Sequence, residues 1–244
     1  NYAGSWFCIV WPFALATFLD SYKNILNKVV TLILLTSITI ALMLTASRNA
    51  WGGLILLIPL MTGSSGIIAL LPLIIITSLL IFISVSPQIP EIFQNSLREI
   101  IPNSIWKKFT DEYYEARISR IEIWWIAIKF ILQKPLIGWG AASFPILYFS
   151  INNIDLRHAH NLALELALSY GLPICILVFS TILLILFFSF KTIFLIKKLN
   201  SISSIDLHDR AWFSSFFVLF LSQIFDIQYF DGRISILFWL LTAG

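Results

Sequence analysis

The sequence predicts an all-α protein: a polytopic bundle of transmembrane helices with one long loop that carries short helices. Hydrophobic residues make up 59% of the 244 residues and charged residues 12%, whereas soluble domains contain about 45–50% and 25%. Several apolar runs approach the roughly 20 residues that a helix needs to cross a bilayer. The net charge is only +3, and no basic cluster is interleaved with aromatic residues, which argues against a nucleic-acid partner.

Seven apolar segments are candidate spans. In chain order they are Gly4 to Leu19, Val29 to Ala46, Trp51 to Met61, Ile67 to Val85, Leu172 to Phe190, Trp212 to Tyr229 and the segment from Ile234 onward. The third is short and contains Gly52, Gly53 and Pro59. Cys8 and Cys175 lie inside apolar segments, where we expect them to pack as small hydrophobic residues.

The two ends of the chain also carry information. It begins at Asn1 without an initiator Met and stops inside an apolar run at Gly244. We therefore expect one membrane domain over residues 1–244 that is a C-terminal fragment of a longer protein.

The orientation of the spans follows from basic residues in short loops, which favour the cytoplasm. Lys23 and Lys28 place the first short loop inside, and Lys191, Lys197, Lys198 and Arg210 do the same for a later one. The two assignments agree if the segment at Trp51 crosses the membrane. Residues 87–157 then form an external loop. The basic residues in this loop do not contradict an external location, because long translocated loops are largely exempt from the bias.

This topology brings unusual polar residues to one face. They are Arg48, Arg120, His158, His160, Asp226, Asp231 and Arg233. Because ionisable groups at membrane depth are costly and are kept mainly for function, the set predicts one external pocket. The alternatives are arginines that snorkel to anchor helix ends and a histidine pair that only caps a membrane helix.

The residue types indicate what such a pocket would bind. The planar guanidinium of arginine suits phosphate oxygens, and a histidine can take a proton from an attacking hydroxyl near neutral pH. Together they suit group transfer from a phosphate-activated donor. No Asp or Glu cluster stands at metal-ligand spacing, so we expect no metal and no cofactor.

Four motifs resemble the O-antigen ligase and polymerase superfamily in order and spacing. They are Ser47 to Trp51, Arg120 to Trp124 leading to Lys134 to Gly140, His158 to Leu162 leading to Tyr170 to Pro173, and Phe225 to Arg233. The last is similar to a cyanobacterial branch whose members have been labelled inorganic-carbon transport proteins.

The resemblance implies a GT-C-like fold and a metal-independent, inverting glycan transferase. The donor would be an undecaprenyl-diphosphate-linked glycan and the acceptor a glycan or lipid. It also implies a multi-pass protein of the bacterial inner membrane, in contact with membrane lipid, whose active site faces the periplasm.

Matching the motifs residue by residue gives each side chain a role. Arg48 and Arg120 are the expected diphosphate-binding residues, and His160 is the expected catalytic histidine. Secondary candidates are His158, Asn161, Arg233, Asp226 and Asp231, and an Asp–Arg pair among the last three could hold the pocket wall.

Three further motifs have competing explanations. Gly138-Trp139-Gly140 has the composition of a turn but could line a glycan groove. Trp124, Trp125, Ile128 and Leu132 recur at helical spacing, as in an interfacial helix or one packed on the bundle. The carboxylates within 111–117 suit a solvated helix face better than acid–base catalysis.

A second functional class stays open: a membrane transporter or transport accessory, possibly for inorganic carbon. It predicts charged residues spaced along the interior of several spans. The spans are nearly bare of charge, which favours glycan transfer. No feature of the sequence supports a passive assembly subunit.

Overall fold

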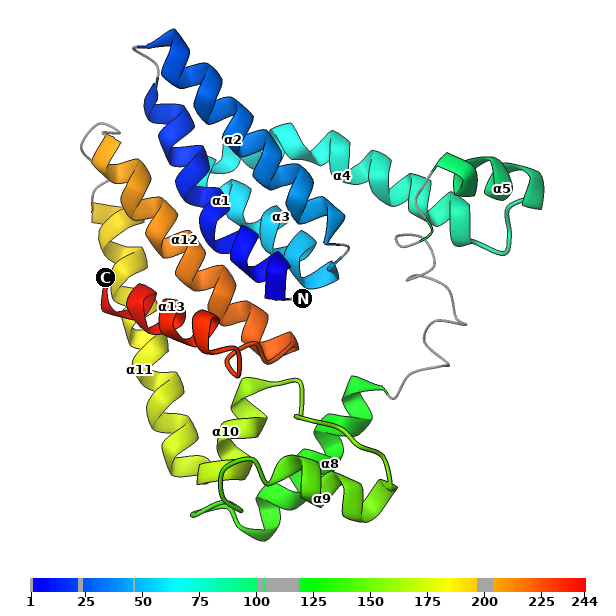
Figure 1. Cartoon of the computed structure of the whole chain (residues 1–244), viewed down its shortest axis with the longest axis vertical. Coiled ribbons are helices and arrows are strands. Elements are labelled where there is room, and N and C mark those ends of the chain that lie inside the picture. The colour runs from blue at the N-terminus through cyan, green and yellow to red at the C-terminus, as the bar shows by residue number, and fades with distance from the viewer. Residues whose placement is uncertain (1, 22–23, 46, 101–102, 104–118, 197–203) are drawn as a thin grey trace. The chain divides into compact units, whose positions relative to one another are not determined.

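The computed structural model describes residues 2–21, 24–45, 47–100, 103, 119–196 and 204–244, in which helices alternate with turns and no strand occurs (Figure 1). The all-α prediction is confirmed. The chain forms two compact units, one of Asn1–Met61 with Arg120–Gly244 and one of Thr62–Ser119. The predicted site residues all belong to the first unit.

The helices agree closely with the predicted segments. They are α1 (Tyr2–Asp20), α2 (Ile25–Leu44), α3 (Arg48–Thr62), α4 (Ser64–Val85), α5 (Glu91–Ile100), α8 (Arg120–Gln133), α9 (Phe144–Asn152), α10 (Leu162–Tyr170), α11 (Leu172–Phe190) continued by η3 (Lys191–Ile196), α12 (Ser204–Phe225) and α13 (Gly232–Ala243). Among the described residues, Tyr2–Asp20, Ile25–Leu44 and Leu172–Leu195 are long and apolar enough to cross a membrane.

The core of the first unit forms around α1 and α12. Helix α1 packs along both α2 and α12, and Trp11 at its centre donates from Nε1 to Thr39 Oγ1 at 2.9 Å. In a bilayer such contacts depend on close packing of small residues rather than on water exclusion. Gly53 of α3 shows this, because an added Cβ would lie 2.9 Å from Val218 and 3.0 Å from Cys8.

Helix α12 differs from its predicted boundaries at both ends. It begins at Ser204, eight residues before the predicted start, and therefore includes His208. Arg210, in the same first turns, places its guanidinium 5.3 Å from the Phe194 ring. At the other end the helix stops at Phe225, four residues before the predicted end, because the backbone turns there to reach α13.

The long loop over residues 87–157 carries α5, α8 and α9, as predicted. Helix α8 packs against α10 and buries Ile123, Ala127 and Phe130, whereas Trp125 is 61% exposed. The buried stripe is therefore offset from the predicted one. The carboxylates within 111–117 lie outside the described residues.

Gly138-Trp139-Gly140 forms a turn that closes the end of α10. The backbone N–H groups of Trp139 and Gly140 donate to the carbonyls of Leu168 and Ser169 at 2.8 and 3.0 Å. Gly138 has φ +69°, and a Cβ there would lie 2.6 Å from the Ser169 backbone, so only glycine fits. These contacts support the structural explanation of this motif.

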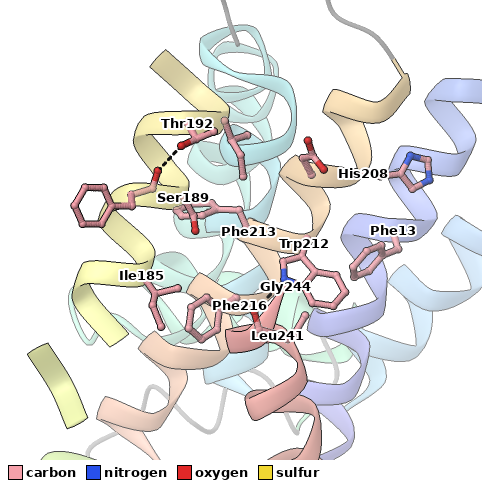
Figure 2. A pocket seen from close by; sticks show the side chains of 13 residues that line it. Phe13, Ile185, Ser189, Thr192, His208, Trp212, Phe213, Phe216, Leu241 and Gly244 are labelled. Carbon is pink, nitrogen blue, oxygen red and sulfur yellow. Dashed lines mark hydrogen bonds between the residues drawn. The ribbon is translucent and has the colours of Figure 1, made fainter. Parts of the chain in front are cut away.

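A cavity of about 580 Å³ opens between α1, α11, α12 and α13 (Figure 2). His208, Asp209 and Trp212 line it on the side of α12, and Phe13 lines it from α1. His208 and Asp226 are 18 residues apart, which at 1.5 Å per residue is about 27 Å along a helix. This cavity contains none of the predicted site residues.

Candidate functional site

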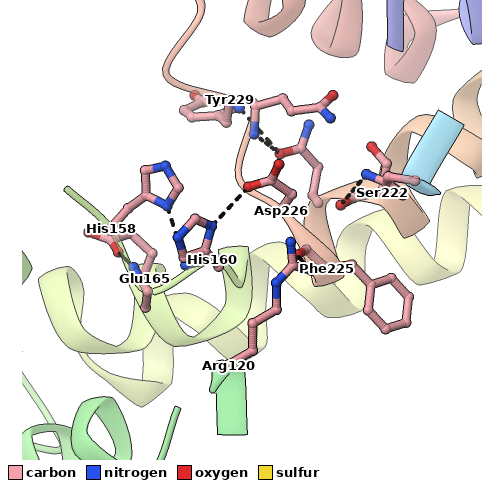
Figure 3. A network of polar contacts seen from close by, with 12 residues as sticks. Arg120, His158, His160, Glu165, Ser222, Phe225, Asp226 and Tyr229 are labelled. Atoms are coloured by element: carbon pink, nitrogen blue, oxygen red, sulfur yellow. Dashed lines mark hydrogen bonds and ion pairs between the residues drawn. The ribbon is translucent and has the colours of Figure 1, made fainter. Parts of the chain in front are cut away.

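The last turn of α12 is where three remote segments of the chain meet. Asn49 donates from its side-chain amide to the Ser222 carbonyl at 3.4 Å, and the guanidinium of Arg120 donates to the Phe225 carbonyl. Nδ1 of His160 lies 3.0 Å from Oδ1 of Asp226 (Figure 3). Asn49, Arg120 and His160 come from the first three of the four sequence motifs. All three thus contact residues within positions 222–226.

His160 is held by the local fold of the loop before α10. Its φ of +53° is left-handed, a conformation that non-glycine residues seldom adopt. The next residue, Asn161, caps α10 by accepting from the Leu164 N–H at 3.1 Å, a common role for Asn at this position. The helix start therefore fixes the backbone beside the imidazole, and the cap is Asn161 and not the histidine pair.

Glu165 supports the same turn from inside the protein. It is 5% exposed, and its Oε2 accepts the Ala159 N–H at 3.1 Å. Burial raises the pKa of this carboxyl, while the hydrogen bond from Ala159 acts in the opposite direction. Glu165 was not among the predicted site residues, although it is the only carboxylate in the apolar run of α10.

His158 packs against His160, with ring centroids 4.3 Å apart at an interplanar angle of 73°. Its Nδ1 accepts the His160 backbone N–H at 3.3 Å, so the proton of the neutral ring belongs on Nε2. Burial lowers the pKa of His158, and the neighbouring His160 lowers it further. His158 is consequently neutral at physiological pH and acts as an acceptor that helps to fix the turn.

His158, His160 and Asp226 together offer a set of donors that could hold a metal ion. One ligand atom from each lies within 4.8 Å of the other two, and two imidazoles with a carboxylate are a known zinc ligand set. Spacing along the chain did not reveal this group, because Asp226 is 66 residues from His160. The pairing of His160 with Asp226 also accounts for much of the proximity without a metal.

Asp226 is positioned by a hydrogen-bonded turn between α12 and α13. The side-chain carbonyl of Gln223 accepts the N–H groups of Gln228 and Tyr229 at 2.9 and 3.2 Å, and Ser5 donates to the Gln228 side chain. Gln223 and Gln228 are each 1% exposed. Ser5, Gln223 and Gln228 were not among the predicted site residues. A glutamine within the apolar run Phe-Leu-Ser-Gln-Ile-Phe nevertheless indicates that its side chain has a polar partner in the fold.

Arg48 begins α3 and is exposed. Its connection to the meeting point runs through its neighbour Asn49, which is bonded to Ser222, and the N–H of Asp226 donates to that same carbonyl at 3.0 Å. Arg48 therefore lies at the same end of α12 as Arg120 and His160.

Asp231 and Arg233 form a pair at the start of α13. The Arg233 guanidinium lies 3.0 and 3.2 Å from the two Asp231 oxygens, and Asp231 also accepts the N–H of Arg233 at 3.0 Å as the helix cap. The hydrogen bond from Arg233 lowers the pKa of Asp231. This is the expected Asp–Arg pair, and in the structure Asp231 caps the start of α13.

An apolar cleft begins two residues after His160 along the chain. It has a volume of about 260 Å³ and lies between α10, α11 and α13, with Tyr229 from the preceding turn. Leu162 lines it, and so do Tyr229 and Trp239, which donates to the Tyr229 hydroxyl at 3.2 Å. Leu162 and Tyr229 thus connect this cleft along the chain to the polar meeting point.

Comparison with known proteins gives a family for this chain. The family model described as O-antigen ligase matches residues 30–179, which is more than half of the chain and includes Arg48, Arg120, His158 and His160. The match ends before Asp226 and the closing segment, so it does not test the expected resemblance to a cyanobacterial branch. No curated protein matches the chain. On the family match, this membrane protein belongs to the O-antigen ligase family.

Proposed function

We propose that this protein transfers a glycan from an undecaprenyl-diphosphate carrier to a sugar or lipid acceptor, on the periplasmic side of the bacterial inner membrane. Family membership supports glycan transfer in general. The observation that carries the specific proposal is the pairing of His160 with the buried Asp226, next to the guanidinium of Arg120.

His160 is the proposed general base. An ionised Asp226 can only accept, so the proton of the imidazole belongs on Nδ1 and the lone pair on Nε2. Nε2 takes the proton of the acceptor hydroxyl as its oxygen attacks the anomeric carbon of the donor sugar. The bond from that carbon to the diphosphate oxygen breaks, and one displacement inverts the configuration. Asp226 orients the ring and stabilises the imidazolium that forms.

Arg120 and Arg48 are the proposed diphosphate ligands. A guanidinium has five N–H donors, so the bond from Arg120 to the Phe225 carbonyl leaves donors for phosphate oxygens. The negative charge on the departing diphosphate grows during the reaction, and fixed cations there lower the barrier. The reaction needs no metal in this scheme.

The apolar cleft beside Leu162 is the proposed path for the first isoprene units of the carrier. Its lining is almost wholly aliphatic and aromatic, which suits a polyprenyl chain that enters from the bilayer. A diphosphate at the α12 turn and a lipid tail in the cleft would be contiguous.

The periplasmic location rests on charge distribution. The end of α1, the start of α2 and His208 near the start of α12 line one cavity together, so the helix ends that flank the two loops with excess Lys and Arg lie together. That end favours the cytoplasm. Asp226 lies at the opposite end of α12, which supports an external site.

The transporter alternative gains no specific observation. Between Arg210 and Asp226, α12 carries no charged residue, although it is central to the first unit. Movement of a solute through proteoliposomes in the absence of any glycan acceptor would nonetheless decide in favour of transport.

The experiment that tests the proposal uses purified protein in proteoliposomes with a labelled undecaprenyl-diphosphate glycan and candidate acceptors. We expect the wild type to form the product and His160→Ala to lose at least ~10²-fold in rate, the usual contribution of a general base. The matched control is His208→Ala, at the far end of α12, which should retain activity. A His160→Ala variant with wild-type transfer would contradict the proposal.

A further inference from the structure

Helix α5 (Glu91–Ile100) turns two polar side chains, Gln94 and Arg98, toward the protein and leaves apolar side chains exposed. It belongs with α4 to the second unit and packs against the end of that helix. Its sequence is strongly amphipathic, with Ile92, Phe93 and Leu97 on one side and Gln94 and Arg98 on the other. A helix on a water-soluble core would place the first group inside.

Hydrogen bonds hold the polar side against α4. The Gln94 side chain is 7% exposed and donates to the carbonyls of Ser86 and Ile89 at 2.7 and 2.9 Å. Arg98 donates to the Ser84 carbonyl at 2.9 Å and to the Gln94 side chain at 2.8 Å. Ser84 is in the last turn of α4 and Ser86 is the residue that follows the helix, so these bonds satisfy carbonyls at its C-terminal end and fix the rotation of α5 about its own axis.

The opposite side of α5 is exposed although it is apolar. Ile92 is 75% exposed and Phe93 is 61% exposed. The surface of α4 has the same character where its side chains are described, with Ile75, Leu79 and Phe82 all more than half exposed. The exposed surface of α5 is therefore apolar in the same way as the exposed surface of α4.

We propose that α5 lies in the interface of the lipid bilayer, with Phe93 inserted among the acyl chains, Ile92 at the edge of the inserted face, and Glu91 and Asn95 in water. Two observations select lipid as the occupant of this face: α4 is a long apolar helix, and α5 is bonded to its end through Gln94 and Arg98. Amphipathic helices of this kind bury one face at the boundary of headgroups and acyl chains.

The consequence for the protein is a fixed depth for the long loop. Because Gln94 and Arg98 prevent α5 from rotating, its insertion holds the first part of the 87–157 loop at the membrane surface. The loop would then be presented to a lipid-linked substrate along the bilayer and not from bulk water. The inference depends on the membrane location of the family and not on glycan transfer, so either proposal can fail alone.

The test is site-directed spin labelling of the protein in lipid nanodiscs. Nitroxide labels are placed on Phe93→Cys, and on Glu91→Cys and Asn95→Cys as the matched polar-side controls, each about 160° from Phe93 around the helix. The native Cys8 and Cys175 are buried, so the unsubstituted protein gives the labelling background. Relaxation is measured with oxygen, which concentrates in lipid, and with a water-soluble nickel chelate.

We expect oxygen to relax the label at 93 more strongly than nickel, with the order reversed at 91 and 95. Equal nickel access at all three positions would show that the apolar face is in water and would overturn the inference. Low access of both reagents at 93 would show that protein covers this face, and it would overturn the inference as well.

Discussion

The Nδ1 atom of His160 lies 3.0 Å from Oδ1 of Asp226, across 66 residues of sequence. The Asp226 carboxylate is buried, whereas the His160 side chain is 29% exposed. Asp226 is therefore enclosed by the protein, and the imidazole is accessible from outside. The histidine lies within the segment matched by the O-antigen ligase family, and its partner lies beyond it.

Replacing Asp226 with Asn should reduce the rate of transfer by at least ~10²-fold, because an amide no longer fixes the tautomer of His160; the equivalent change in a serine protease costs about 10⁴-fold. The loss should fall on kcat, since donor binding relies on other side chains. The control is Asp231→Asn, which keeps an oxygen to cap α13 and should have a far smaller effect. Equal losses in the two variants would remove Asp226 from the reaction.

Replacing Arg120 with Ala should raise the KM for the diphosphate donor by about 10- to 100-fold, the range expected when a hydrogen bond to a charged group worth roughly 1.5–3 kcal/mol is lost. Arg157→Ala, also exposed and in the same loop region, is the matched control. If Arg120 only caps α12, its replacement will instead lower the melting temperature and leave KM unchanged.

Replacing Glu165 should separate its hydrogen bond from its charge. Glu165→Ala leaves the buried Ala159 N–H without its acceptor, which costs about 1–3 kcal/mol of unfolding free energy. Glu165→Gln keeps a carbonyl oxygen there and should be close to wild type in thermal unfolding. A Glu165→Ala variant as stable as Glu165→Gln would show that this bond does not hold the turn.

Stability should also depend on pH through Glu165. Its pKa is raised in the folded chain, so the folded state retains the proton at pH values where the unfolded state has lost it. Stability therefore falls as pH rises from the ordinary carboxyl pKa through the raised one. Melting temperatures measured over this window should fall in wild type relative to Glu165→Gln. Parallel curves would contradict the assignment.

Metal ions should inhibit the enzyme and not activate it. EDTA should leave transfer unchanged, whereas Zn²⁺ should slow it by occupying His158, His160 and Asp226. In His158→Ala the Zn²⁺ concentration that halves the remaining rate should rise at least ~10-fold, which corresponds to 1.4 kcal/mol of lost affinity. Loss of activity in EDTA with recovery on adding a metal would contradict the metal-independent scheme.

Much of the fold was predictable because membrane helices are defined by apolar length. The segment Leu172–Phe190 has the same bounds in sequence and structure, and α1 differs from its prediction by two residues at the start and one at the end. The ends of α12 were not predictable in this way. Its start contains charged residues that hydropathy places in a linker, and its end depends on the Gln223 side chain.

The predicted topology also placed Arg120, His160 and Asp226 on the external face of the membrane. It did not predict that His160 pairs with Asp226. That pairing requires the left-handed backbone of His160, the cap at Asn161 and the turn after Phe225, none of which has a hydropathy signal. For α5 the amphipathic pattern indicates a helix, yet only the bonds of Gln94 and Arg98 show which side faces the protein.

The central claim, that His160 and Asp226 work as one unit, is tested most directly by a double-mutant cycle. Single-turnover transfer is measured for the wild type, His160→Ala, Asp226→Ala and the variant with both changes. Residues that act as a unit have strongly non-additive effects, so the double variant should be no slower than His160→Ala alone. If the two losses multiply instead, the residues contribute independently and the paired base is wrong.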